Sequence, residues 1–362
     1  MGQYWTLFNI SHEQNMGSSG AKLGEMLFCG SYNKLVQYLA RPTGFDRELT
    51  WISASHAGRV EHKKQLGSLS RFPDEILVLI LKSFLGPQPD NQRRWGLYTL
   101  ALTNTYLAEI AYEVVQRDFM EYVPQWVIHR LICVGDYSRA DDLPPDVFHQ
   151  PEVDAMKGYE ELMDYLFARC PKDHSESDFG GWTMDGAPKA LGLQKIERRW
   201  DDQSQCLEDL STTRVLYDGS PEDWVLANST TAEYVRFDAI VEMQDCRDLV
   251  TKGPFMDHQY YTFGLGHVIL SRICWSSDES VAMDTEGLSY QLHRGPWAGH
   301  RFTIGRKELL GEEGWTDISD QVVKDMEILA KGFYGSGWRE RVKKMKYQYT
   351  SEYLNQDHYS LW

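Results

Sequence analysis

The sequence lacks a run of 18 apolar residues, and it lacks a basic N-terminal region followed by an apolar stretch. A membrane-spanning helix and a secretory signal are therefore not expected. It also lacks a CxxC pair, which argues against a zinc cage and against a disulfide framework. The six cysteines are widely spaced, at Cys29, Cys133, Cys170, Cys206, Cys246 and Cys274. We expect reduced thiols, and hence a cytoplasmic or nuclear protein.

Basic residues are few in comparison with acidic ones. The chain has 37 Lys and Arg against 53 Asp and Glu, which gives a formal net charge of −16. The negative electrostatic potential of such a chain repels phosphate backbones, so a nucleic-acid partner is not expected. The one basic run, RERVKKMK at residues 339–346, is interpreted as a solvated helix face, with a small docking patch as the alternative.

Motifs that carry enzyme chemistry are absent as well. The sequence has no G-x-G-x-x-G, Walker loop, H-E-x-x-H or G-x-S-x-G, and the glycine pair at residues 264–266 lacks a third glycine. The carboxylates between residues 136 and 142 flank a Pro-Pro pair, which indicates a solvated turn. A triad assembled from distant parts of the chain stays open, because such sites form in space and not in sequence order. No catalytic residue, metal or cofactor is predicted.

What the sequence does contain is typical of a globular protein. Apolar residues make up 42% and charged residues 25% of the 362 positions, enough for two domains or for one domain with an insertion. Strand-like patterns occur at residues 4–10, 126–134, 223–228, 267–274 and 299–304. Helical patterns occur at residues 22–40, 73–84, 95–115, 151–169 and from 319 onward, with linkers at 41–68 and 171–213. This mixture predicts an α+β fold.

Three short sequence blocks occur twice in the same order. They follow the patterns W-x-L-x-N-x-[ST], L-G-x with three apolar residues, and W-x-x-H-R-[LF]. The paired blocks are residues 5–11 and 224–230, 23–28 and 265–270, and 126–131 and 297–302. A duplicated α/β module would explain this order, and chance similarity between Trp-rich segments is the alternative.

The spacing of the repeated blocks predicts an insertion in the front copy. Trp5 and Trp126 lie 121 residues apart, whereas Trp224 and Trp297 lie 73 residues apart, a difference close to the length of a helical segment at 69–115. The predicted organisation is therefore a first module at 1–68 and 116–170, the helical segment at 69–115, a linker or long loop at 171–213, a second module at 214–335 and a tail at 336–362.

A His-Arg pair in each copy gives four candidate ligand-binding residues, His129, Arg130, His300 and Arg301. Adjacent residues on a strand point to opposite faces, so a pair can line one pocket only if a bulge intervenes. In the structural interpretation, each His-Arg pair belongs to an ordinary strand. The functional interpretation is an arginine contact to an anion or a carboxylate in each module.

Residues 69–115 resemble an F-box. The first part reads L-S-R-F-P-D-E-I-L at 69–77 with I-L at 80–81, and the second part reads L-A-L-T-N-T-Y-L-A-E-I-A at 100–111. Phe72 replaces the usual leucine before proline, and the connection at 86–94 is longer and more polar than the family pattern. The match covers about one eighth of the chain.

The resemblance implies a protein-interaction role, in which a Skp-type adaptor of a cullin ubiquitin ligase binds the helices and an unknown target protein is presented for ubiquitination. The adaptor-binding residues that it implies are Phe72, Pro73, Ile76, Leu77, Ile80, Leu100 and Leu107. A helical hairpin packed on the chain's own sheet is the structural alternative. The functional alternative is an enzyme or a small-ligand-binding protein with a site between the two modules.

The blocks outside the helical segment resemble a largely fungal group of proteins that begin G-Q-Y-W and contain K-L-G-E and W-x-G-x-R. This second resemblance implies a shared fold and no particular reaction. Residues 1–6 also match the form M-G-x-x-x-[ST] of an N-myristoylation signal, although residues 4–8 equally favour the start of a strand with buried aromatics.

Overall fold

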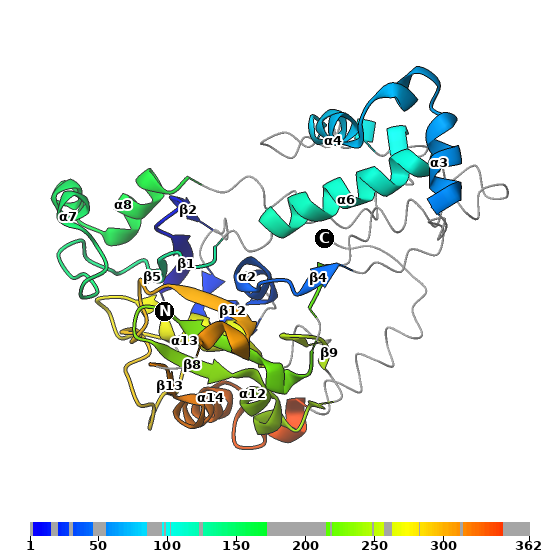
Figure 1. The fold of residues 1–362 in the computed structure, drawn as a ribbon. Helices are drawn as coiled ribbons and strands as arrows, with labels where there is room; N and C mark the ends of the chain where they lie inside the picture. Colours follow the sequence, from blue (N-terminus) through cyan, green and yellow to red (C-terminus); the bar gives the residue numbers. More distant parts are fainter. Residues whose placement is uncertain are drawn as a thin grey trace, which may run out of the picture. The chain divides into compact units, whose positions relative to one another are not determined.

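The computed structural model places the chain in two compact units (Figure 1). The sheet unit comprises Met1–Arg41, Pro124–Asp173 and Tyr217–Trp362, and the helical unit comprises Pro42–Val123 and His174–Leu216. The residues that the structure describes are 3–15, 21–28, 32–45, 56–84, 96–97, 99–101, 103–122, 126–171, 215–217, 219–247, 250–256, 263–281, 283–311 and 314–342. Apart from Pro171, the predicted linker at 171–213 lies outside these residues.

The first sheet is built on two neighbouring antiparallel strands, β1 (Tyr4–Asn9) and β5 (Leu131–Gly135). Both strands are buried almost throughout, which explains their nearly continuous apolar and aromatic sequences. Two short strands, β2 (Gln14–Asn15) and β3 (Ala21–Lys22), pair with β1. A fifth strand, β11 (Cys274–Trp275), pairs in parallel with β5.

The second sheet has the strand order β12-β7-β8-β13. Its strands β12 (Phe302–Arg306), β7 (Trp224–Asn228) and β8 (Glu233–Arg236) are antiparallel neighbours, and β13 (Thr316–Asp317) pairs in parallel with β8. A separate hairpin joins β9 (Val250–Lys252) to β10 (Phe255–Met256), with Gly253 at a positive φ in its turn. Together with the helices, these sheets confirm the predicted α+β class.

Each sheet is joined by a segment from the part of the chain that builds the other sheet. β11 belongs to the C-terminal part of the chain, which builds the second sheet, but it lies beside β5 of the first sheet, where Cys133 N donates to Ile273 O at 2.9 Å. In the other direction, Ala40 from the front block forms a parallel bridge with Ile304 of β12, and Arg41 N donates to Ile304 O at 2.8 Å. Neither sheet is therefore built from one block alone.

Helices of the sheet unit pack against both sheets. They are α1 (Leu23–Phe28), α2 (Tyr32–Leu39), α7 (Gln150–Met156), α8 (Leu162–Arg169), α12 (Phe237–Gln244), α13 (Leu265–Arg272) and α14 (Ser319–Tyr334). α14 begins at Ser319, within the start predicted at Ser319 or Asp320. Of the apolar residues predicted to be buried on it, Val322, Met326 and Leu329 are buried and Val323 is half-buried. Among the described residues, no helix is long and apolar enough to cross a membrane.

Two sequence predictions are wrong in the sheet unit. Residues 267–272 are not a strand but belong to α13, whose eight residues are all buried, its polar ones included, so the sequence shows no solvent-facing side that would indicate a helix. Trp126–Ile128 form a turn with Ile128 at φ 59°, so the strand predicted at 126–134 begins only at Leu131. The predicted tail is folded at least to residue 342, because Trp338 and Val342 are buried.

The helical unit is larger than the predicted segment at 69–115. It contains α3 (His56–Lys64), a 3-10 helix (Gly67–Arg71), α4 (Asp74–Lys82), α6 (Thr105–Tyr122) and the strand pair β4 (Gly44–Phe45) and β6 (Val215–Leu216). The prediction of a linker at 41–68 is therefore wrong. α4 begins after Pro73 with Asp74 and Glu75 in its first turn, as its sequence predicts.

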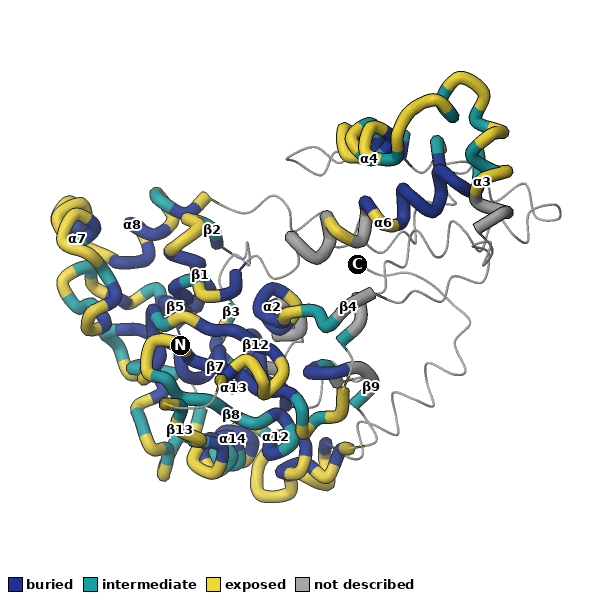
Figure 2. Tube along the Cα trace, viewed as in Figure 1, coloured by how far each residue is buried: buried dark blue, intermediate teal, exposed yellow. Residues whose placement is uncertain are grey.

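A core of its own holds the helical unit together. It is formed by α4, α6 and the described residues at 97–101, and its buried members are Leu77, Leu81, Leu97, Ala101, Tyr106, Leu107, Ala108, Ile110, Ala111, Tyr112 and Val114. The other side of α4 carries exposed residues (Figure 2). The apolar helices thus bury one face within their own unit and leave another in solvent.

Candidate functional site

The repeated W-x-L-x-N and W-x-x-H-R blocks form the same hydrogen bonds in each sheet. Asn9 Nδ2 lies 3.3 Å from His129 Nδ1, and Asn228 Nδ2 lies 3.0 Å from His300 Nδ1. Each asparagine also accepts a backbone N–H through Oδ1, at 3.1 Å from both His12 N and Thr230 N. An amide donating to Nδ1 leaves the imidazole proton on Nε2. The histidines are therefore held in place as part of the strand connections.

The arginine and tryptophan positions correspond in the same way. Arg130 N donates to Ser11 Oγ and Arg301 N to Thr230 Oγ1, each at 3.0 Å, and the two arginines form an antiparallel bridge. All four block tryptophans, Trp5, Trp126, Trp224 and Trp297, are buried. These counterparts support a duplication, which stays a prediction. They also explain why the same residue types recur at the same positions within the paired blocks.

The side chain of Arg130 is not free to bind a ligand. It is buried and forms two hydrogen bonds to Glu152, each at 3.0 Å, and a third to Val147 O at 2.6 Å. Arg169 NH1 approaches the same carboxylate at 3.0 Å. Burial alone would raise the pKa of Glu152, but the hydrogen bonds from Arg130 and His149 N lower it to about 2. The carboxylate that Arg130 contacts is thus an internal one, and a ligand-binding role for this residue stays a prediction.

The other three candidate residues do not form one site with Arg130. Burial lowers the pKa of His300, and burial with the charges of His12 and Arg301 lowers the pKa of His129 to about 4. The rings of His12 and His129 meet edge to face at 4.3 Å between centroids. Arg301 is exposed, whereas Arg130 is buried. The structure thus brings His129 and Arg301 together near His12 and turns the Arg130 side chain elsewhere.

A third histidine, His267, makes the protein's stability depend on pH. Burial lowers its pKa to about 3, and it accepts a 3.0 Å hydrogen bond from Gly264 N that closes the first turn of α13. Below pH 6.5, the ordinary pKa of histidine, His267 binds a proton in the unfolded chain but stays neutral in the folded protein. The free energy of unfolding therefore falls as pH falls from 6.5 toward 3. Between pH 6.5 and 5 this residue should cost about 2 kcal/mol of unfolding free energy. Urea unfolding at both pH values should show a smaller pH dependence in His267→Gln than in the wild type, and an equal dependence would contradict this assignment.

The described residues outside these networks offer no metal centre. No group of three or more His, Cys, Asp or Glu side chains in the described part of the chain could hold an ion. The cysteines at positions 133, 170, 246 and 274 are buried free thiols, and burial raises the pKa of Cys170 to about 12. A thiol with such a raised pKa is a poor nucleophile at neutral pH.

Exposed apolar residues follow one face of α4. Ile76 and Leu79 are 39% and 62% exposed, and their spacing of three residues places them on one side of the helix axis. Phe72, which is 42% exposed, lies in the extended backbone just before the helix. We call these three residues the α4 stripe. Leu77 and Leu81 point into the core of the helical unit from the opposite side. The core of the helical unit needs only one apolar side of α4, so the second, exposed apolar side indicates a surface for a binding partner.

Not all seven predicted adaptor-binding residues lie on this surface. Phe72, Pro73 and Ile76 are exposed, whereas Ile80 and Leu100 are half-buried against the core. Leu77 and Leu107 are buried inside that core, so their assignment to a partner surface is wrong. Sequence reasoning missed Leu79, although its position three residues after Ile76 was the signal that could have identified it.

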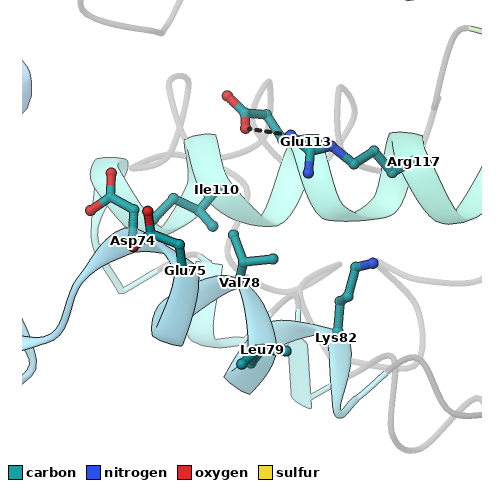
Figure 3. A pocket seen from close by; sticks show the side chains of 8 residues that line it. All are labelled: Asp74, Glu75, Val78, Leu79, Lys82, Ile110, Glu113 and Arg117. Carbon is teal, nitrogen blue, oxygen red and sulfur yellow. Dashed lines mark ion pairs between the residues drawn. The ribbon is translucent and has the colours of Figure 1, made fainter.

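A groove of about 460 Å³ runs beside the stripe, between α4 and α6 (Figure 3). The residues that line it are Asp74, Glu75, Val78, Leu79, Lys82, Ile110, Glu113 and Arg117. Asp74 is engaged by Lys63 and by the Tyr106 hydroxyl, and the hydrogen bond to Asp74 raises the pKa of Lys63. Along α4 the groove has acidic residues at the start, apolar residues in the middle and Lys82 at the end, and on α6 it is lined by the ion pair of Glu113 and Arg117.

No family model matches the chain, and no curated protein or solved structure is similar to it at a significant level. Its function is therefore inferred from the geometry of its own residues.

Proposed function

We propose that the protein is an F-box-like adaptor, in which the α4 stripe binds a Skp-type adaptor of a cullin ubiquitin ligase and the sheet unit presents a target protein. The observation that carries this proposal is the exposure of three large apolar side chains, two on α4 and one just before it, in a unit that already has its own core. The F-box resemblance of residues 69–115 supports the same face. Phe72, Pro73 and Ile76 are the residues that the resemblance implies and that are also exposed.

Burial of the stripe would supply the association free energy. Each large apolar side chain that moves from water into a dry contact contributes about 1.5–3 kcal/mol, less the fraction that is already covered in the free protein. Ile76 and Leu79 already lie on a preformed helix, and Phe72 lies two residues before it, so binding requires little further ordering of the backbone. The buried residues Leu77 and Leu107 would act indirectly, by holding α4 in place.

The proposal predicts that Ile76→Asp abolishes co-purification with the Skp-type adaptor. An unpaired carboxylate in the dry contact should weaken binding by several kcal/mol, or roughly a hundredfold or more. Val60→Asp is the matched control, because Val60 is 43% exposed on α3 of the same unit and lies outside the stripe. Recovery of the adaptor with Ile76→Asp at the level seen with Val60→Asp would exclude the stripe as the binding face.

The alternative of an enzyme or small-ligand-binding protein remains a prediction. Arg130 belongs to an internal ion pair, and both block histidines are held by asparagines. No described contact therefore favours this interpretation over the adaptor.

A further inference from the structure

The charges along α4 have an order that bears on what can dock there. Asp74 and Glu75 lie in the first turn and Lys82 in the last turn. Asp74 is neutralised within the unit by Lys63. Glu75 and Lys82 are exposed, and neither is in an ion pair with a described residue. One free carboxylate and one free ammonium therefore mark the two ends of the helix, seven residues or about two turns apart.

The apolar contact surface lies between these two charges. Leu79, at 62% the most exposed of the large apolar side chains that the structure describes, is four residues after Glu75 and three before Lys82. Figure 3 shows Val78 pointing toward Ile110 of α6, with Lys82 and Arg117 beyond it at the basic end. The middle of the groove is thus apolar and its two ends carry opposite charge.

A segment that fits this surface needs an acidic first turn, an apolar middle and a basic last turn, and it must run antiparallel to α4. Acidic residues at the start and basic residues at the end are also the arrangement that a helix dipole favours. α4 itself meets all of these requirements. Two copies of α4 placed antiparallel would pair Glu75 of each copy with Lys82 of the other, and Leu79 would lie next to the two-fold axis.

We propose that the α4 face is a self-association surface, whose occupant is α4 of a second copy of this chain. Leu79 of each copy occupies the apolar middle of the other copy's groove, above Val78 and Ile110. At the basic end, Lys82 is the free cation that meets the acidic turn of the incoming helix, because Arg117 is paired with Glu113 on α6 at 3.8 Å. The interface is isologous, because the same residues serve both sides.

The size of this face predicts a weak dimer. Two turns of one helix offer little contact surface in comparison with stable interfaces, which bury roughly 1,200–2,000 Å² in total. Dimerisation is therefore concentration-dependent. The inference does not rest on the adaptor function, but the two are linked, because a second copy on Leu79 covers the α4 stripe. Self-association would then compete with adaptor binding.

Sedimentation velocity of the full chain over a wide concentration range tests the proposal through a charge-reversal cycle. The wild type should show a sedimentation coefficient that rises with concentration. Glu75→Lys and Lys82→Glu should each weaken association by about tenfold or more. Each substitution places two charges of the same sign opposite one another at both symmetry-related ends of the interface. The double variant Glu75→Lys/Lys82→Glu should restore wild-type association. An equimolar mixture of the two single variants should form a heterodimer.

Glu61→Lys is the matched control, because it makes the same change in net charge at an exposed position of α3. It should associate as the wild type does, and circular dichroism should show that every variant keeps its helices. The proposal is overturned if the wild type remains monomeric at the highest concentration. It is also overturned if Glu61→Lys weakens association as much as Glu75→Lys, or if the double variant and the mixture both fail to restore it.

Discussion

Replacing Glu152 by glutamine is expected to lower the free energy of unfolding by about 3–5 kcal/mol, the usual cost of leaving a buried charge without its partner. Arg130 is buried, and both of its terminal nitrogens donate to the Glu152 carboxylate at 3.0 Å. The same carboxylate accepts from His149 N at 2.8 Å and so also closes the first turn of α7. Chemical denaturation at pH 7 would measure the loss.

A second substitution separates the charge effect from simple loss of packing. Arg130→Met removes the buried cation, so the double variant Arg130→Met/Glu152→Gln should be more stable than Glu152→Gln alone. Asp154→Asn on the same helix is the control, because Asp154 pairs with Lys157 in solvent and its loss should change little. A Glu152→Gln variant as stable as Asp154→Asn would show that the buried pair contributes nothing.

The same ion pair has a defined pH dependence. The pKa of Glu152 is about 2 in the folded protein, below its ordinary value of 4.5. Its contribution is therefore fully present above pH 4.5 and is lost as pH falls toward 2. Wild type and Glu152→Gln should converge in stability over that range, whereas the effect of His267 appears between pH 6.5 and 3.

Gly299→Ala is expected to destabilise the protein by about 3 kcal/mol or more. Gly299 has φ 75°, and a β-carbon there would lie 2.1 Å from Val147 Cγ1, far inside van der Waals contact. Strain at positive φ and forced displacement of a packed valine both contribute. Thermal unfolding would measure the change, and Val147→Ala in the same background should recover part of it because it removes the γ-carbons.

Ile128 occupies the corresponding position in the front block, and the opposite result is expected there. Its φ is 59°, which is unfavourable for a β-branched residue, and its side chain is 53% exposed. Ile128→Gly should leave the unfolding free energy unchanged or raise it by up to about 1 kcal/mol. A large destabilisation by Ile128→Gly, or none by Gly299→Ala, would contradict this account of the two turns.

Local signals in the sequence predict the ends of elements better than they predict which side faces the core. Pro73 and the acidic first turn locate the start of α4 correctly, and Ser319 locates the start of α14. Residues 76–81 of α4 are all apolar, so the sequence does not distinguish the buried Leu77 from the exposed Leu79. That distinction depends on where α6 packs, which is a tertiary property.

The partner of Arg130 could not be predicted from the sequence for a similar reason. The partner of Arg130 is Glu152, 22 residues further along the chain on a different helix. A His-Arg pair in sequence carries no information about which carboxylate will face it after folding. The repeated blocks, by contrast, were detectable because their hydrogen bonds depend on short, fixed patterns around Asn9 and Asn228.

The exchange of segments between the two sheets has a consequence for synthesis of the chain. β5 ends at Gly135, but its parallel neighbour β11 is complete only when Trp275 has been made, 140 residues later. At about 5–20 residues per second, the ribosome needs roughly 7–30 s to cover that distance. Throughout this interval the backbone edge of β5 has no native partner on that side. Association with chaperones, or non-native strand pairing, would therefore be concentrated in nascent chains between these two lengths.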